Sequence, residues 1–173
     1  MAITADQIFG PLPDAAEVIR VTIRLITALF IGGVIGLQRE ITHHAAGLRT
    51  HMLVSLGTAV LVVCAHESGM TPSDVSRIVQ GIVTGIGFLG GGAILKLTSE
   101  REIRGLTTAA GIWLTAAASV AAGLGRIGSA LLGTVLALFV LMALRKVEKK
   151  IVRRVFGSKE NNTLGIDNTD GDG

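Results

Sequence analysis

The strongest constraint on this chain is an internal duplication. Residues 30–63 recur without a gap 58 positions later, as residues 88–121. In each copy an apolar run leads into a short charged connector, and a second apolar run opens with the pattern Gly-Leu-x-Thr. Identical residues include the pairs Phe30/Phe88, Gly32/Gly90, Leu37/Leu95, Gly47/Gly105, Leu48/Leu106 and Thr50/Thr108. We interpret the repeat as one helical hairpin used twice, an arrangement that recurs in membrane transport folds.

The composition indicates a membrane protein. Hydrophobic residues make up 49% of the 173 positions, and the mean hydropathy is +0.60. Apolar runs approach the roughly 20 residues that a helix needs to cross hydrocarbon; they cover 25–38, 52–66, 78–95, 105–125 and 127–144. We therefore expect an all-α integral membrane protein with five transmembrane helices, in which two parallel-repeat hairpins are followed by a fifth helix.

Three regions are expected along the chain. Residues 1–19 should form a periplasmic N-terminal segment with a helix that leads into the first span. Residues 20–156 should form the five-helix membrane domain. The polar, Gly-rich residues 157–173 should be a disordered cytoplasmic tail.

Lys and Arg predict the orientation, because cytoplasmic loops collect them. With the N terminus outside and the C terminus in the cytoplasm, 12 basic residues lie inside and four, Arg20, Arg24, Arg77 and Arg126, lie outside. Both repeat connectors then face the cytoplasm, so the two hairpins would be related by a pseudo-twofold axis along the membrane normal. The expected location is a bacterial inner membrane.

Two helix starts can be read directly. Asp14 and Glu17 have the spacing of a helix N-terminus. Thr71 is expected to cap a helix that has Pro72 at its first position and Asp74 near its positive end.

Glycines are abundant in the apolar runs. The stretch from Gly85 to Gly90 matches G-x-G-x-x-G, but a dinucleotide fingerprint needs a preceding strand, and this stretch lies inside an apolar run. Two alternatives stay open: close packing between helices, or a break in the third helix that frees carbonyls for an ion or substrate. The glycines concerned are Gly32, Gly36, Gly81, Gly85, Gly87, Gly90, Gly91 and Gly92.

The connectors supply the candidate functional residues. Glu40 lies between Arg39 and Arg49, which predicts either a salt bridge that locks the hairpin or one wall of a site for cations or phosphate. The cytoplasmic cluster comprises Arg39, Glu40, Arg49, Thr50, His51, Arg104, Thr107 and Thr108. On the outer face, Glu67 and Asp74 are candidates for a weak divalent cation site, although exposed charges on a helix surface are the simpler interpretation.

Catalytic patterns are missing from the sequence. It has no Cys-x-x-Cys, His-Glu-x-x-His or phosphate-binding loop, so an enzyme is not expected. The basic run at 145–154 directly follows a span, which favours anionic lipid over nucleic acid as its partner. No cofactor is expected, and Mg²⁺ is the one ion considered.

Five segments carry a family resemblance: 35–40, 46–51, 76–78, 85–92 and 104–110. They resemble the MgtC/SapB family of bacterial inner-membrane proteins, in order and over about residues 30–145. The resemblance implies a five-helix domain linked to magnesium homeostasis and to regulation of membrane partners such as the ATP synthase. Gln38 stands where family members commonly have Glu, and the chain has no counterpart of the soluble C-terminal domain of the MgtC branch. We therefore expect the short SapB-like branch.

Two functions remain in competition. A non-enzymatic regulator or scaffold would act through helix contacts with a membrane-protein partner, whereas a transporter or channel would move Mg²⁺ or another small solute. Transport sites usually place polar groups at the bilayer midplane, and the chain offers mainly Gln80, Thr84 and Thr115 there, which favours regulation. A homo-oligomer, most simply a dimer, is expected because five spans do not bury every small-residue face.

Overall fold

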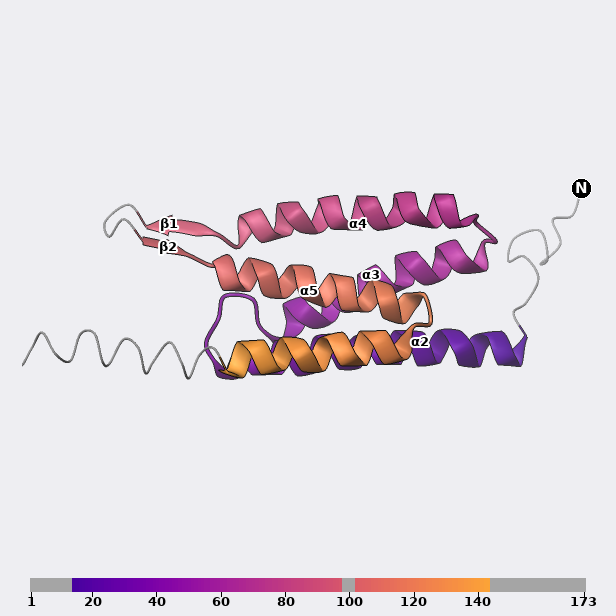
Figure 1. Ribbon diagram of the computed structural model, residues 1–173, viewed down its shortest axis with the longest axis horizontal. Helices are drawn as coiled ribbons and strands as arrows, with labels where there is room; N and C mark the ends of the chain where they lie inside the picture. The colour runs from indigo at the N-terminus through magenta and orange to yellow at the C-terminus, as the bar shows by residue number, and fades with distance from the viewer. Residues whose placement is uncertain (1–13, 98–101, 144–173) are drawn as a thin grey trace, which may run out of the picture. The chain divides into compact units, whose positions relative to one another are not determined.

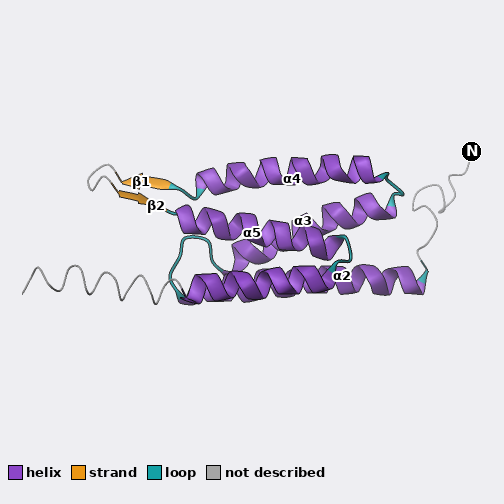
Figure 2. Ribbon diagram, viewed as in Figure 1, coloured by secondary structure: helices purple, strands orange, loops and turns teal. Residues whose placement is uncertain are grey.

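The structure is a computed structural model that describes residues 14–97 and 102–143, with side chains at 14–94 and 105–143. Its first unit ends at Thr134, and the second begins at Val135. The first unit contains α2 (Ala15–Ile41), α3 (Leu48–Glu67), α4 (Pro72–Gly92), β1 (Leu95–Leu97), β2 (Glu102–Arg104) and α5 (Leu106–Gly123). A further apolar helix covers Ile127–Ala143. Figures 1 and 2 show this succession of helices. The tail expected at 157–173 lies outside the described residues.

The helix starts agree with the sequence. Asp14 immediately precedes α2, which begins at Ala15. Its side chain accepts a hydrogen bond from the backbone N–H of Glu17. Thr71 and Asp74 form a reciprocal capping box at the start of α4, with Pro72 in the first turn. α2 runs through residue 19 without interruption to Ile41, so the expected entry helix and the first expected span are one continuous helix.

The glycine run does not break the third helix of the bundle. α4 is continuous from Pro72 to Gly92, although it contains six glycines after residue 80. The alternative of a helix break with freed carbonyls is therefore wrong for this structure.

In the first unit, α2 packs against α3 and α4 packs against α5, while α5 also contacts α2 and α3. Both connectors, 42–47 between α2 and α3 and the strand pair between α4 and α5, lie at the left end of the helices in Figure 1. The start of α2 and the turn between α3 and α4 lie at the other end. This arrangement agrees with the expectation that the two connectors share one side. We call the end of the helices where both connectors lie the connector end.

The second connector is not a simple loop. Leu95–Leu97 pairs antiparallel with Glu102–Arg104, and the hairpin extends past the ends of α4 and α5 (Figure 1). The all-α fold class is confirmed for the described residues, and this short strand pair is an addition that the sequence did not predict. The alternation of apolar and charged residues in Leu-Lys-Leu and Glu-Ile-Arg suits a short strand pair, but it is too brief to stand out beside the apolar runs.

A glycine immediately precedes the second helix of each hairpin. Gly47 and Gly105 are the residues just before α3 and α5, so each Gly-Leu-x-Thr pattern does open a helix. Gly105 has φ of +98°, and a Cβ there would lie 2.0 Å from the Ala93 carbonyl oxygen. Glycine is required at this position because L side chains rarely adopt this conformation.

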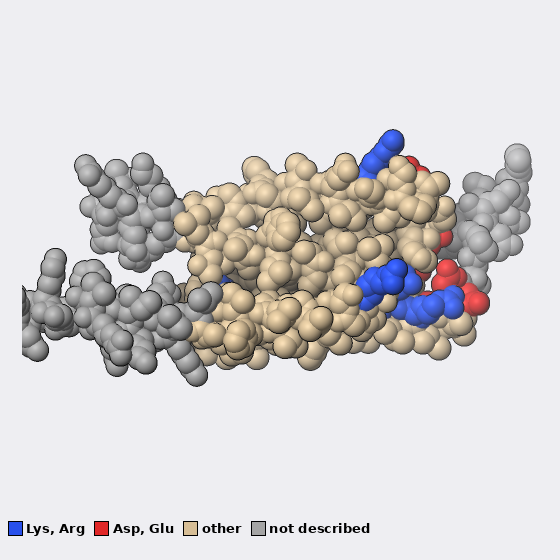
Figure 3. All heavy atoms as spheres, in the orientation of Figure 1, with Lys and Arg blue, Asp and Glu red and all other residues tan. Residues whose placement is uncertain are grey.

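Among the described residues, three helices are long and apolar enough to cross a membrane: α2, α3 and α5. α4 has 21 residues, and Ile127–Ala143 is a shorter apolar helix. In the view of Figure 3, charged side chains gather where α2 and α4 begin, while the flanks carry other residues. Many large hydrophobic side chains are exposed on the helices, including Phe30, Leu53, Phe88, Leu106 and Leu132. Such a surface suits lipid rather than water.

Candidate functional site: a buried polar core

Polar side chains meet where α2, α3 and α5 pack together. We call this group the polar core; each member is at most 3% exposed, and they are Arg39, His51, Ser55, Thr108, Thr115 and Ser119. On α3 the members are four residues apart, and on α5 they follow at steps of seven and four, so each set lies on one helix face. The core thus faces inward, away from lipid.

Arg39 occupies the connector end of the polar core. It lies in the last turn of α2, is 1% exposed, and donates from Nη2 to Thr108 Oγ1 at 3.1 Å. Its Nε–H has no hydrogen-bond partner. Because a guanidinium is always charged in proteins, a permanent positive charge is buried here against a neutral hydroxyl.

His51 is the next member along α3, and it is fully buried. Its Nδ1 lies 2.8 Å from Thr115 Oγ1. The hydroxyl of Thr115 donates to the carbonyl oxygen of Gly111 at 2.9 Å, so it has no second hydrogen to offer. We therefore assign the shared hydrogen to His51 Nδ1, which leaves Nε2, an atom without a partner, as the other ring nitrogen.

Two serines complete the polar core. Ser55 Oγ lies 2.6 Å from Ser119 Oγ, and it also reaches the carbonyl oxygen of Ala28 in α2. Ser119 Oγ reaches the carbonyl of Thr115 at 2.7 Å. Hydrogen bonds of this kind join helices in a membrane, where water does not compete. Three helices are therefore connected by neutral hydroxyl groups.

Close approach of α2 and α3 depends on two of the predicted glycines. A Cβ at Gly32 would lie 2.6 Å from the His51 carbonyl oxygen, and a Cβ at Gly36 would lie 2.8 Å from Leu48 Cα. At the equivalent place in the second hairpin, a Cβ at Gly90 would lie 3.5 Å from Ala109 Cβ. The remaining predicted glycines have open space where a Cβ would be, namely Gly81, Gly85, Gly87, Gly91 and Gly92.

Glu40 has a different role from the salt bridge considered from the sequence. Its Oε2 accepts a hydrogen bond from the backbone N–H of Leu48 at 2.9 Å, and a Cβ on Gly47 would collide with this carboxylate. No ion pair involving Glu40 occurs among the side chains that the structure describes. The hairpin is thus locked by a carboxylate at the positive end of α3, not by Arg39 or Arg49.

The predicted cytoplasmic cluster is only partly assembled. Arg39, His51 and Thr108 are buried in the polar core, whereas Arg49, Thr50 and Thr107 are exposed. The side chain of Arg104 lies outside the described residues. Thr50 and Thr108 match in the repeat, but they differ in burial because α5 packs against α2, α3 and α4. Of this set, Arg39 and Thr108 meet through a hydrogen bond, whereas Arg49, Thr50 and Thr107 face outward.

The outer candidates do not form a metal site in the described part of the chain. Glu67 is exposed at the end of α3, and an Asp74 oxygen accepts from the hydroxyl of Thr71 at 2.6 Å. Within residues 14–94 and 105–143 there is no group of three or more His, Cys, Asp or Glu side chains that could hold a metal ion. Asp74 is accounted for as a helix cap.

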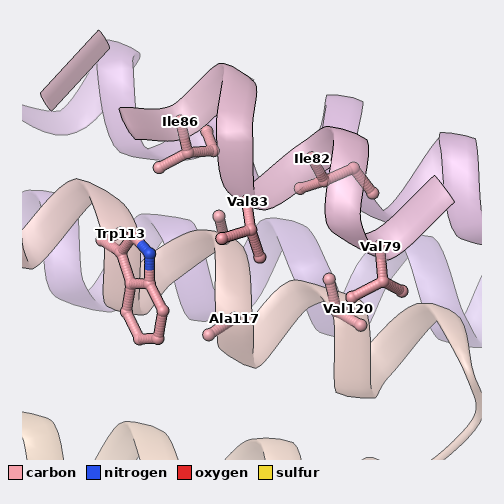
Figure 4. A pocket seen from close by; sticks show the side chains of 8 residues that line it. Val79, Ile82, Val83, Ile86, Trp113, Ala117 and Val120 are labelled. Atoms are coloured by element: carbon pink, nitrogen blue, oxygen red, sulfur yellow. The ribbon is translucent and has the colours of Figure 1, made fainter. Parts of the chain in front are cut away.

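Two cavities lie beside α4. One of about 150 Å³ lies between α4 and α5 and is lined by apolar residues (Figure 4), among them Val79, Ile86 and Trp113. Another of about 420 Å³ lies at the connector end, where Thr50 is the one polar side chain of its lining. Neither cavity offers charged groups to an ion.

Ser55, Gly111 and Ser119 were not among the residues predicted from the sequence. Their signal was present, since Thr108, Thr115 and Ser119 recur at helical spacing in an otherwise apolar segment. Gln80 and Thr84, the other midplane candidates, are exposed on α4, and only Thr115 is buried. Which polar face turns inward depends on helix packing, which the spacing alone does not give.

Comparison with known proteins identifies relatives of this chain by sequence. The MgtC family model matches residues 25–150. Protein MgtC of Salmonella typhimurium is 39% identical over 129 residues, which cover 75% of this chain and 54% of that protein. Protein SrpB of Synechococcus elongatus is 37% identical over 137 residues, 73% of this chain and 75% of its own. YhiD of Escherichia coli K12, named as a candidate magnesium transporter, is 36% identical over 139 residues, 76% of this chain and 64% of its own. This chain therefore spans about half the length of MgtC, and no solved structure matches it.

Proposed function

The chain belongs to the MgtC family of membrane proteins, and we propose that it is a non-enzymatic regulator or scaffold in magnesium homeostasis. The link to magnesium rests on relatives, because YhiD is named for magnesium transport. The chain spans about half of MgtC, so no activity of that whole protein is carried over. The proposed partners are lipid, a second copy of the chain and another membrane protein.

The proposal rests on the hydrogen bonds that the polar core makes between helices. Its hydroxyl, imidazole and guanidinium groups bind one another across α2, α3 and α5. Each residue is at most 3% exposed, so these groups hold helices together in the interior and do not line an open path. A rigid, internally bonded bundle with apolar flanks is suited to binding a partner within the membrane.

The proposed arrangement in the membrane has five spans, the N terminus outside and the C terminus in the cytoplasm of a bacterial inner membrane. The positive-inside distribution supports it. The two hairpins are proposed to be related by a pseudo-twofold axis. Gly32 approaches His51, and Gly90 approaches Ala109, which are equivalent residues of the two repeats. This matched pair of helix crossings supports the duplication.

Transport of Mg²⁺ is the second candidate function. The name of YhiD favours it, and so does the row of glycines on α4 with open space beside it, which could line a path shared with another copy. Under this alternative the polar core would brace the bundle, and the path would lie outside a single chain.

A paired experiment separates the two functions. The full chain is tested for growth of a magnesium-sensitive strain in low Mg²⁺, and the same purified chain is reconstituted in liposomes that contain a Mg²⁺ indicator. We expect improved growth, with Mg²⁺ entry no faster than in protein-free liposomes. An ionophore added at the end of each run shows that the indicator responds. Mg²⁺ entry that rises in proportion to the protein content would favour transport and overturn the regulatory proposal.

A further inference from the structure

We propose that Arg20, Arg24 and Arg126 bind the phosphate of one anionic phospholipid at the end of the first unit opposite the connector end. Arg20 and Arg24 belong to α2, and Arg126 lies in the turn that follows α5. The inference does not rest on the proposed function, because a regulator and a transporter could both hold such a lipid.

The first argument is the position of Arg24. Its Nη1 donates to the carbonyl oxygen of Gly123, the last residue of α5, at 3.3 Å. The guanidinium also lies against Gly125, where a Cβ would be 3.1 Å from Nη2 and 3.2 Å from Nε. These contacts hold Arg24 beside the turn that carries Arg126.

The second argument is that the arginines gather from two elements. Arg20 precedes Arg24 by four residues, so the two share one face of α2. In Figure 3, basic side chains lie together over the first half of α2 and the turn after α5. Like charges four residues apart on a helix repel each other, so an anion between these residues would be stabilising. Arginine is well suited to phosphate, which it can bind through two N–H groups at once.

The third argument is that these arginines lack a paired carboxylate. None of the three forms an ion pair with a carboxylate among the side chains that the structure describes. The described carboxylates at this end are Asp14, Glu17, Glu67 and Asp74. Asp14 and Asp74 already accept hydrogen bonds as helix caps. The donors of the three arginines are therefore not taken up by protein carboxylates.

The fourth argument concerns the apolar surface beside the arginines, which favours a lipid over a free anion. The buried residues of α2 begin at Ala28, so the arginines of α2 lie on its uncovered part. Ile19 and Ile23 are 58% and 52% exposed, and each directly precedes one of these arginines. A row of isoleucines thus runs alongside the row of arginines. A phospholipid matches both rows, with its phosphate on one and an acyl chain on the other.

The test uses the full chain, purified in mild detergent and titrated with phosphatidylglycerol or with zwitterionic phosphatidylcholine. Native mass spectrometry measures the lipid-bound fraction. We expect tighter binding of phosphatidylglycerol, and we expect Arg20→Gln and Arg126→Gln each to weaken it about fivefold. Both side chains are exposed, so without added lipid the variants should melt at the temperature of the unsubstituted chain.

Arg77→Gln is the matched control. Arg77 is exposed on α4 at the same end of the unit, so this variant removes the same charge outside the proposed site and should bind phosphatidylglycerol normally. The basic run at 145–154 is unchanged in every variant, so the comparison isolates the three arginines.

Two outcomes of the titration would overturn the proposal: equal affinities of the unsubstituted chain for the two lipids, or an equal loss of binding in Arg77→Gln and Arg20→Gln. A third arm adds inorganic phosphate in large excess to the phosphatidylglycerol complex. We expect the lipid to stay bound, because the isoleucine row holds its acyl chain. Displacement by phosphate would show a site for a free anion and would contradict the assignment to a lipid.

Discussion

Arg39 and Glu40 are neighbours at the end of α2, yet they stabilise the connector end in different ways. Arg39 points into the polar core and bonds Thr108, whereas Glu40 reaches across the connector to the first turn of α3. A carboxylate at a helix N-terminus interacts favourably with the unpaired N–H groups and the helix dipole. Each of the two charged side chains therefore stabilises the connector end without an ion pair between them.

We expect Glu40→Ala to lower the free energy of unfolding by about 1–2 kcal/mol, since it removes a charge-assisted hydrogen bond at the positive end of α3. Thermal melting of the full chain in nanodiscs measures the effect. Glu67→Ala is the control, because Glu67 is exposed at the negative end of the same helix and its removal should cost little. Equal melting temperatures for both variants would show that Glu40 does not cap α3.

Two adjacent glycines show how the packing of α2 against α3 is determined at the scale of helices. A Cβ on Gly32 would come within 3.0 Å of three atoms of α3, in His51, Met52 and Ser55. Gly33, the next residue, has nothing within 4 Å of that position. The same substitution at the two sites thus separates helix packing from helix propensity.

Gly32→Ala should destabilise the bundle by about 1–3 kcal/mol, because α2 and α3 must move apart and weaken the hydrogen bonds of the polar core. Gly33→Ala should raise the stability by up to about 1 kcal/mol, because alanine favours the helix. Unfolding of both variants in a denaturing detergent titration checks the opposite signs. A loss of stability in both would mean that the crossing point of the two helices is elsewhere.

Local features of these elements could be predicted, and long-range contacts could not. The caps at Asp14 and Thr71 depend on residues three positions apart, so the sequence shows them directly. The bond between Ser55 and Ser119 joins residues 64 positions apart and depends on how three helices pack. The sequence likewise does not distinguish Arg39 from Arg49, because burial depends on helix packing. Of these two residues, Arg39 is buried and Arg49 is exposed.

At the scale of the whole molecule, α4 is the helix of the first unit that the chain covers least. Its buried residues are Ile82, Ile86 and Gly90, which form a single row. The opposite side carries the open glycines, beginning with Gly81 and Gly85. Small residues are enriched where membrane helices meet because they let backbones approach closely. This side of α4 is therefore the surface on which the proposed dimer would form.

We expect native mass spectrometry of the full chain in mild detergent to show a dimer, since closed twofold association is the commonest symmetric outcome. Gly85→Leu should shift the population to monomer, because a leucine side chain would hold two α4 backbones apart. Gly57→Leu is the matched control: Gly57 also has open space around it, but it belongs to α3, so the dimer should persist. If the unsubstituted chain is monomeric at every ratio of protein to detergent, the dimer is wrong. If Gly57→Leu dissociates the dimer and Gly85→Leu does not, α3 rather than α4 forms the contact.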